Sequence, residues 1–214
     1  MENLQDLLLI LPAILLALTL HECAHGWMAY RLGDPTARNA GRLTLNPLPH
    51  LDPVGTLLLI ITTLYHLGSF GWAKPVPVNH LNFSKPRRDT ILVSLAGPLS
   101  NIALAIIAGV LYKHFAFSMN HFLRDFTSIC VAINIGLAFF NLIPIPPLDG
   151  SHVLIGFLPR QFIPRYLNAT RYVPIAFLLL IVAEQVLRLP LLSYVLDPLY
   201  VPFKAVCLLV INLF

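Results

Sequence analysis

Two histidines and a glutamate stand together at the end of a long apolar run. In "ALTLHECAHGWMAY" (residues 17–30), His21 and His25 are four positions apart, and Glu22 follows His21 directly. Residues at i and i+4 share one face of a helix, with Cβ atoms about 5–6 Å apart, so both imidazoles can reach one metal ion. Glu22 is rotated by about 100° from His21. It therefore flanks the metal, where it can take a proton from an attacking water.

The alternative is that these polar residues only stabilise helix packing. In a membrane helix that alternative is unfavourable, because a charged side chain near the centre costs roughly 2.5–3.5 kcal/mol on insertion scales. Intramembrane ionisable groups are therefore candidates for function. Two histidines do not complete a site, however, because catalytic zinc centres use three protein ligands and one open position.

The best candidate for a third ligand lies in "FFNLIPIPPLDGSHVL" (residues 139–154). Asp149 follows an apolar span that a proline-rich break ends, and Gly150 lets the backbone turn sharply. Irregular backbone at membrane depth is tolerated only where protein or a water-filled cavity satisfies it. A carboxylate there would complete a site of two histidines and one aspartate. The other interpretation is that Asp149 caps a short helix, and the residues themselves leave both open.

The composition indicates a membrane protein. Of the 214 residues, 57% are hydrophobic and 11% are charged, against about 25% charged in soluble domains, and the mean hydropathy is +0.76. The net charge of +4 is no nucleic-acid signal, because no run of Lys and Arg with interleaved aromatics exists. We expect one integral membrane domain over residues 1–214, with its core motifs at about 7–158 and C-terminal helices at 172–214.

The apolar stretches predict an all-α polytopic fold with about five to six transmembrane helices. A full helical span needs about 20 residues. One further stretch is too short and is expected to be re-entrant or membrane-embedded, and the last one is interrupted by Asp197, Pro198, Pro202 and Lys204. Two alternating stretches, at 41–47 and 73–78, predict a small β element. The apolar stretches are 7–32, 54–67, 91–112, 126–145, 172–187 and 189–214.

The candidate site itself restricts the topology. His21, His25 and Asp149 must lie at one depth, so the two spans that carry or precede them run in the same direction. An odd number of crossings then separates them, and the short stretch 54–67 is the one expected not to cross. Ten of the fourteen basic residues then share one side, which the positive-inside rule makes cytoplasmic: Arg31, Arg38, Arg42, Lys74, Lys85, Arg87, Arg88, Arg160, Arg165 and Arg171. The site is expected inside the membrane, nearer that face.

Three motifs together resemble the site-2 protease family of intramembrane zinc metalloproteases, in a minimal form without soluble appendages. They are "HECAH", "AGPLSN" (residues 96–101) and "NLIPIPPLDG" (residues 141–150), in that order. The resemblance implies that His21, His25 and Asp149 hold one zinc ion and that Glu22 is the general acid and base. It also implies that Asn101 and Asn141 lie near the cleavage site and help to hold the substrate backbone or the oxyanion.

The resemblance further implies a substrate and a location. The expected substrate is a single-span membrane protein in the lipid bilayer, and the expected location is a prokaryotic cell membrane. The distribution of basic residues, not the resemblance, places the site towards the cytoplasm. The extended stretch 73–78 is a candidate for pairing with an unwound substrate strand; the alternative is a stiff loop without a partner. Two rival functions remain: an intramembrane metal transporter, and an inactive protease-like scaffold.

Overall fold

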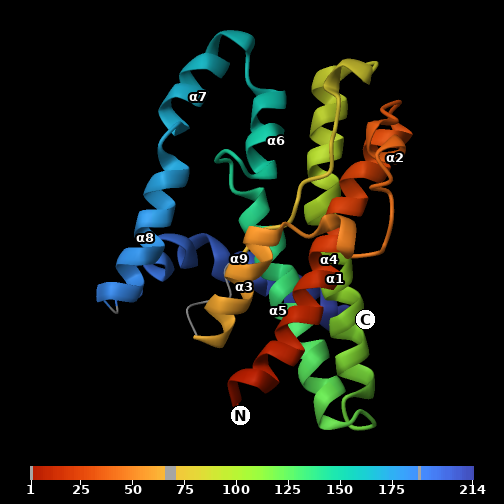
Figure 1. The fold of residues 1–214 in the computed structure, drawn as a ribbon, viewed down its shortest axis with the longest axis vertical. Coiled ribbons are helices and arrows are strands. Elements are labelled where there is room, and N and C mark those ends of the chain that lie inside the picture. The colour runs from red at the N-terminus through yellow and green to blue at the C-terminus, as the bar shows by residue number, and fades with distance from the viewer. Residues whose placement is uncertain (1, 66–70, 188) are drawn as a thin grey trace.

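The computed structural model describes residues 2–65, 71–187 and 189–214, and helices dominate them. Three long helices form the centre: α1 (Glu2–Arg31), α4 (Pro86–Phe115) and α5 (His121–Leu142). In Figure 1, α1 and α5 run in the same direction and α4 runs opposite to them. The others are α2 (Thr36–Asn39), α3 (Pro53–Leu64), α6 (Asp149–Phe157), α7 (Ile163–Thr170), α8 (Val173–Leu187), α9 (Leu191–Leu213) and short 3-10 turns at Leu48–His50, His80–Asn82 and Arg160–Phe162.

Small side chains let the three central helices approach closely. Ala13 of α1, Ala105 of α4 and Ala138 of α5 are almost fully buried. Ala13 also packs with Ala108 and Cys130 in one cluster that draws on all three helices. Close packing through small residues is the usual way in which helices associate in a membrane, where lipid and side chains are equally apolar.

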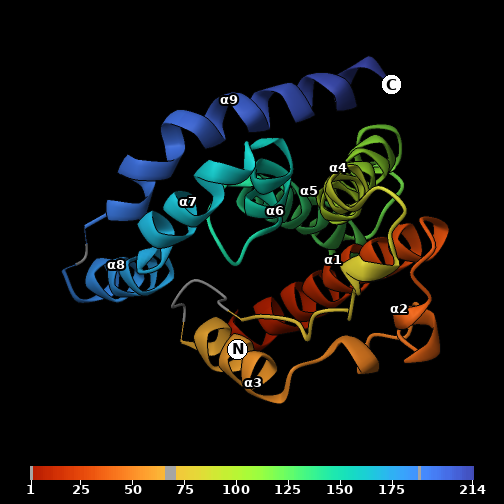
Figure 2. The same ribbon diagram turned by 90° about the horizontal axis from the view of Figure 1, so that it is seen from above.

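Four segments of the described chain are long and apolar enough to cross a membrane: Leu7–Arg31, Pro86–Phe115, His121–Leu142 and Ser193–Leu213. They confirm the prediction of an all-α polytopic membrane protein. α8 has 15 residues, fewer than the roughly 20 of a full span. α9 is one helix in spite of its two internal prolines. It lies across α4 and α5 (Figure 1, Figure 2).

The short apolar segment that contains α3 returns to where it began. Asp52 caps α3 by accepting hydrogen bonds from the N–H groups of its first turn. Leu51 forms an antiparallel bridge with Ala73, and the N–H of Lys74 donates to the carbonyl of His50 over 2.8 Å. Both ends of the segment therefore lie side by side, as a stretch that does not cross the membrane requires. Its last predicted residues, 66 and 67, lie outside the described residues.

The predicted β element is reduced to that single bridge in the part of the chain that the structure describes. The stretch 41–47 is not a strand, because its side chains satisfy the backbone locally: the N–H of Asn46 donates to Thr44 Oγ1, and that of Leu48 to Asn46 Oδ1. The stretch 73–78 is extended, but Pro75 and Pro77 have no N–H to contribute to a ladder.

The fully buried carboxylate of Asp34 fastens the end of α1 to the chain that follows the extended stretch. Its Oδ2 accepts from the N–H of Asn79 over 2.7 Å, and its Oδ1 accepts from Asn82 Nδ2 over 2.7 Å and from the N–H of Thr36. Burial by itself raises the pKa of Asp34, but these hydrogen bonds lower it below its ordinary value, so the group is an anion at neutral pH. This anchor holds the extended stretch against the histidine-bearing part of α1.

Candidate metal centre

Three side chains that are far apart in the sequence converge at one point. His21 and His25 lie on α1, and Asp149 begins α6. The Nε2 atoms of the two histidines are 3.0 Å apart. Asp149 Oδ2 lies 3.2 Å from the first of them and 3.3 Å from the second. These three atoms form a nearly equilateral triangle and are a group that could hold a metal ion.

The hydrogen bonds behind the two histidines determine where their protons are. His21 Nδ1 lies 2.7 Å from Asn101 Oδ1, and His25 Nδ1 lies 2.7 Å from the carbonyl oxygen of Val93. Both partners accept hydrogen bonds, so each neutral ring carries its proton on Nδ1 and has a bare lone pair on Nε2. Histidines that bind metals are oriented in this way, through a partner on the other nitrogen.

A cation fits the point that these atoms surround. Asp149 Oδ2 is buried without a hydrogen-bond partner among the described residues, and it faces two bare nitrogen atoms. Such a group of lone pairs is repulsive unless a cation lies between them. Zinc at about 2.0–2.1 Å from each ligand in tetrahedral geometry requires ligand atoms about 3.3 Å apart. The spacings found here match that requirement closely.

Asp149 reaches this point because α6 turns back tightly on the end of α5. A Cβ atom at Gly150 would lie 2.2 Å from the carbonyl oxygen of Leu142, so only glycine fits there. The other interpretation of Asp149, as a helix cap, is not supported by its contacts: α6 has no side-chain cap hydrogen bond, and its N-cap residue is Leu148.

Gly97 on α4 makes room for the imidazole rings of both His21 and His25. A Cβ atom there would lie 2.4 Å from His25 Nε2 and 2.6 Å from His21 Cε1. α4 can therefore pass the histidine face of α1 only where it has no side chain. The sequence carried a signal for this in "AGPLSN", but the need for glycine at this position follows from the contact between the two helices.

Glu22 stands beside the three ligand atoms, not among them. It lines the same cleft of about 340 Å³ as His21, His25, Asn141 and Asp149. Its Oε2 accepts a hydrogen bond from the backbone N–H of Val76 over 2.7 Å. The carboxylate is therefore held at the edge of the cleft by the extended stretch that passes over α1.

The extended stretch turns its hydrogen-bond donors towards the protein. The N–H groups of Lys74 and Val76 donate to the carbonyl of His50 and to Glu22. Backbone groups alternate in direction along an extended chain, and the alternate positions are Pro75 and Pro77, which have no N–H. The outer edge therefore offers acceptors but few donors. It can pair only with N–H groups of a partner strand.

Asn101 is part of a buried chain of amides that ends on His21. Its Oδ1 contacts His21 Nδ1, and its Nδ2 donates to Asn134 Oδ1 over 2.8 Å and to the carbonyl of Ala17 over 3.2 Å. Asn134 Nδ2 in turn donates to the carbonyl of Cys130. Both asparagines are fully buried. These contacts favour a positioning role for Asn101 over the direct contact with substrate that the resemblance implies. Sequence reasoning missed Asn134, whose only signal was an amide inside an apolar span.

Replacing Asn101 with leucine is expected to weaken zinc binding about 10–100-fold, the usual effect of losing a partner behind a metal ligand. Without Asn101 Oδ1, the ring of His21 is free to rotate and to change tautomer. Chelator competition on the purified protein measures the affinity. Replacing the exposed Ile107 on the outer face of the same helix is the control. An unchanged affinity in Asn101→Leu would assign the amide to helix packing alone.

Asn141 has a different environment. Its Nδ2 donates to the carbonyl of Leu137 in its own helix over 3.0 Å, and the side chain lines the cleft with Glu22 and Asp149. Within the described chain, no hydrogen bond joins Asn141 to another helix. These contacts leave it available to a bound peptide.

Replacing Asn141 with leucine is expected to lower turnover roughly 10²–10³-fold, the effect of removing a donor to developing charge, with zinc content and thermal stability nearly intact. Steady-state cleavage, zinc analysis and thermal melting of the same preparation test this. A destabilised but fully active Asn141→Leu protein would show that the amide only holds helices together.

Comparisons with known proteins identify the relatives of this chain. A model of Peptidase family M50 matches residues 110–181. "Putative zinc metalloprotease YwhC" of Bacillus subtilis (strain 168) is 42% identical over 193 residues, covering 87% of this chain and 83% of that protein. "Putative zinc metalloprotease Rip2" of Mycolicibacterium smegmatis is 32% identical over 147 residues, covering 69% of this chain and 56% of that protein. No solved structure matches.

The fold and the site define an integral membrane protein whose helical core contains a group of side chains that could hold a metal ion. The extent of the similarity to YwhC then decides the family. This chain belongs to Peptidase family M50, the site-2 protease family.

Proposed function

We propose that this chain is a zinc metalloprotease that hydrolyses peptide bonds within or near the membrane-spanning segment of other membrane proteins. The observation that carries the proposal is the convergence of two bare imidazole nitrogens and an unpartnered carboxylate oxygen within 3.3 Å, with Glu22 at the edge of the same cleft. The printed names of the relatives, which describe zinc metalloproteases, agree with it.

The chemistry divides between the metal and the side chains. His21, His25 and Asp149 would hold the zinc ion, which would supply Lewis acidity to polarise a carbonyl and to lower the pKa of water towards about 7. Glu22 accepts the proton of the attacking water at its carboxylate and delivers it to the leaving amine. The Val76 N–H orients that carboxylate, and Asn101 holds His21 in the required tautomer.

The proposed substrate is a single-span membrane protein whose helix unwinds locally. A peptide bond in an intact helix is shielded by its own hydrogen bonding, so an extended stretch must enter the cleft. Asn141 and the outer edge of the segment at 73–78 are the groups available to hold it. The edge accepts hydrogen bonds, and an unwound backbone supplies donors.

Two other functions fit the arrangement less well. A metal transporter requires ligands spaced along a path, whereas here three ligand atoms form one compact group among the described residues. An inactive scaffold does not need a carboxylate beside three potential metal ligands, since a neutral acceptor would serve the Val76 N–H equally well. The protease is therefore the function that the geometry supports best.

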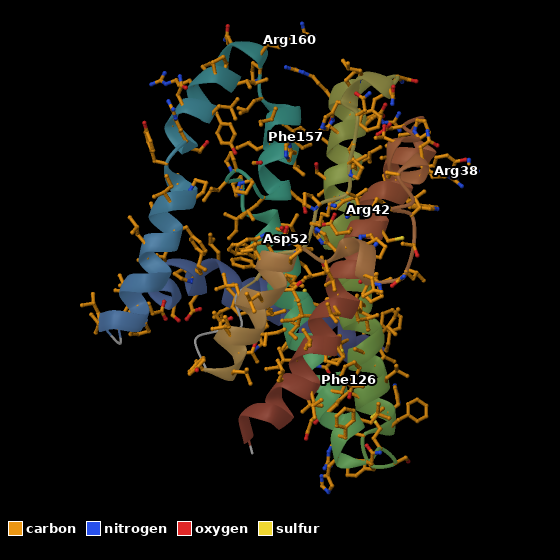
Figure 3. The ribbon with its side chains drawn as sticks, viewed as in Figure 1. Arg38, Arg42, Asp52, Phe126, Phe157 and Arg160 are labelled. Atoms are coloured by element: carbon orange, nitrogen blue, oxygen red, sulfur yellow. The ribbon has the colours of Figure 1, made fainter. Side chains whose placement is uncertain are left out.

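The proposed orientation places the site towards the cytoplasm. Figure 3 places Arg38 and Arg160 at one end of the molecule and Phe126 towards the other. The loops rich in basic residues lie at the first end, which the positive-inside rule assigns to the cytoplasm.

Cysteines introduced at Arg38 and at His121 are expected to react with an impermeant thiol reagent from opposite sides of the membrane, after replacement of the three native cysteines. Arg38 should react only when the cytoplasmic face is accessible, because it follows the C-terminal end of α1, and His121 begins α5 at the other end. Labelling of both positions from one side would contradict the proposed topology.

The experiment that tests the function combines two measurements on one purified preparation. Zinc per chain should be close to one, and the protein should cleave a single-span peptide whose apolar helix contains a central Asn-Gly. A chelator should abolish cleavage, and added zinc should restore it. Cleavage that survives complete removal of zinc would refute the proposal.

A further inference from the structure

A second hollow, outside the catalytic cleft, lies between α1, α3 and α5. Its volume of about 500 Å³ falls in the range of about 300–1,000 Å³ typical of binding sites. Aliphatic and aromatic side chains form most of its walls, among them Ile14, Leu18, Leu59, Ile133 and Phe140. Two of the three helices are membrane-spanning candidates. The hollow therefore suits an apolar occupant.

Residues that line the hollow and residues that line the catalytic cleft are close neighbours in three segments of the chain. On α1, Thr19 lines the hollow and His21 lines the cleft; on α5, the neighbouring pair is Phe140 and Asn141. The extended stretch supplies the third pair, since position 73 lines the hollow and position 75 lines the cleft. A chain that lies in the hollow is therefore held close to the cleft that Glu22 lines.

His50 contributes one buried, unsatisfied hydrogen-bond acceptor next to this apolar surface. The residue is 2% exposed and lines the hollow. Its Nε2 lies 3.0 Å from the carbonyl oxygen of Thr44, which only accepts, so Nε2 carries the proton and Nδ1 has a bare lone pair. Within the described chain, the buried Nδ1 has no hydrogen-bond partner.

The position of this ring is set by contacts on both sides. The N–H of His50 donates to the carbonyl of Pro47 over 2.9 Å, and its carbonyl accepts from Lys74. These bonds tie the ring to the turn before α3 and to the extended stretch. Buried polar groups without a partner are rare in native proteins and call for an explanation; a donor that arrives with a ligand is one.

We propose that this hollow binds the apolar segment of the substrate and that His50 Nδ1 accepts a hydrogen bond from a backbone N–H of its unwound stretch. The inference rests on the proposed protease function and adds a binding residue to it. A lipid acyl chain would fill the apolar walls but has no donor for Nδ1. A peptide that leaves its helical conformation has free N–H groups, and it must do so next to the catalytic cleft.

Gly136 on α5 leaves space for such an occupant. A Cβ atom built there meets nothing within 4 Å, and Ala132 lies one turn earlier on the same wall. These two small residues expose the helix backbone to whatever lies in the hollow. A larger side chain at position 136 would enter the hollow without displacing any part of the protein.

Two substitutions of His50 separate substrate binding from a structural role. The amide nitrogen of His50→Gln can still donate to the Thr44 carbonyl, but no acceptor remains at the position of Nδ1. His50→Asn has the reverse properties, with an acceptor near Nδ1 and no donor to Thr44.

Binding of a biotinylated single-span peptide with a central Asn-Gly is measured in the Glu22→Gln background, where the peptide is not cleaved. We expect about tenfold weaker binding for the Gln variant and near-native binding for the Asn variant.

Gly136→Leu provides an independent test of the hollow. It is expected to fold, to retain zinc and to melt no lower than the native protein, yet to raise the KM for the same peptide at least tenfold. Ile107→Phe, which enlarges an exposed side chain on α4 away from the hollow, is the matched control and should cleave normally.

The outcomes distinguish the occupants. Unchanged binding in the Gln variant, or weaker binding only in the Asn variant, would overturn the role of His50 and leave a buried water as the partner of Nδ1. Normal cleavage by Gly136→Leu would assign the hollow to lipid and overturn the docking site. If native protein cleaves nothing and holds no zinc, the proposed function itself fails, whereas the peptide-binding measurements still decide the hollow.

Discussion

Replacement of Glu22 by glutamine is expected to abolish proteolysis while zinc content and fold are preserved. A positioned general base contributes about 10²–10⁴-fold to rate, and an amide cannot accept the proton of water. The fold should survive, because the amide oxygen of glutamine can still accept the hydrogen bond that Val76 donates to Glu22 over 2.7 Å. The variant therefore removes the proton acceptor and little else.

The measurement is initial-rate cleavage of a single-span peptide, with zinc per chain determined on the same sample. Asp125→Asn is the matched control, since it neutralises an exposed carboxylate on α5 away from the cleft, and it should cleave at the native rate. Native cleavage by Glu22→Gln would rule out the proposed mechanism.

Replacement of Asp149 by alanine is expected to remove zinc and activity together. Its Oδ2 is the anionic corner of the ligand triangle, 3.2 Å and 3.3 Å from the two histidine nitrogens. Loss of a group behind a ligand costs about 10–100-fold in affinity, and loss of a ligand itself should exceed that range. The protein should therefore lose zinc during dialysis.

The control for this variant is a true helix cap. Asp52 accepts hydrogen bonds from the first turn of α3, so Asp52→Ala should lower stability by about 1 kcal/mol and retain zinc. If Asp149→Ala behaved like Asp52→Ala, with zinc retained and only stability reduced, Asp149 would be a cap and another residue would complete the site.

The sequence by itself determined the features that depend on local geometry. Helical periodicity brings His21 and His25 to one face and turns Glu22 aside, whatever surrounds the helix. Apolar length predicted the long helices, and the break before Asp149 marked the irregular turn. The parallel course of α1 and α5 also followed, since ligands of one ion must share one depth.

Only the tertiary structure decided what depends on contacts between distant segments. Asn101 was expected near substrate, but the approach of α4 to α1 brings its amide to His21 and links it to Asn134. The same approach requires glycine at position 97. The hollow next to His50 exists only because the segment containing α3 folds back along α1. A pattern in one segment specifies that segment's faces, whereas the partner of each face is selected by packing across the whole chain.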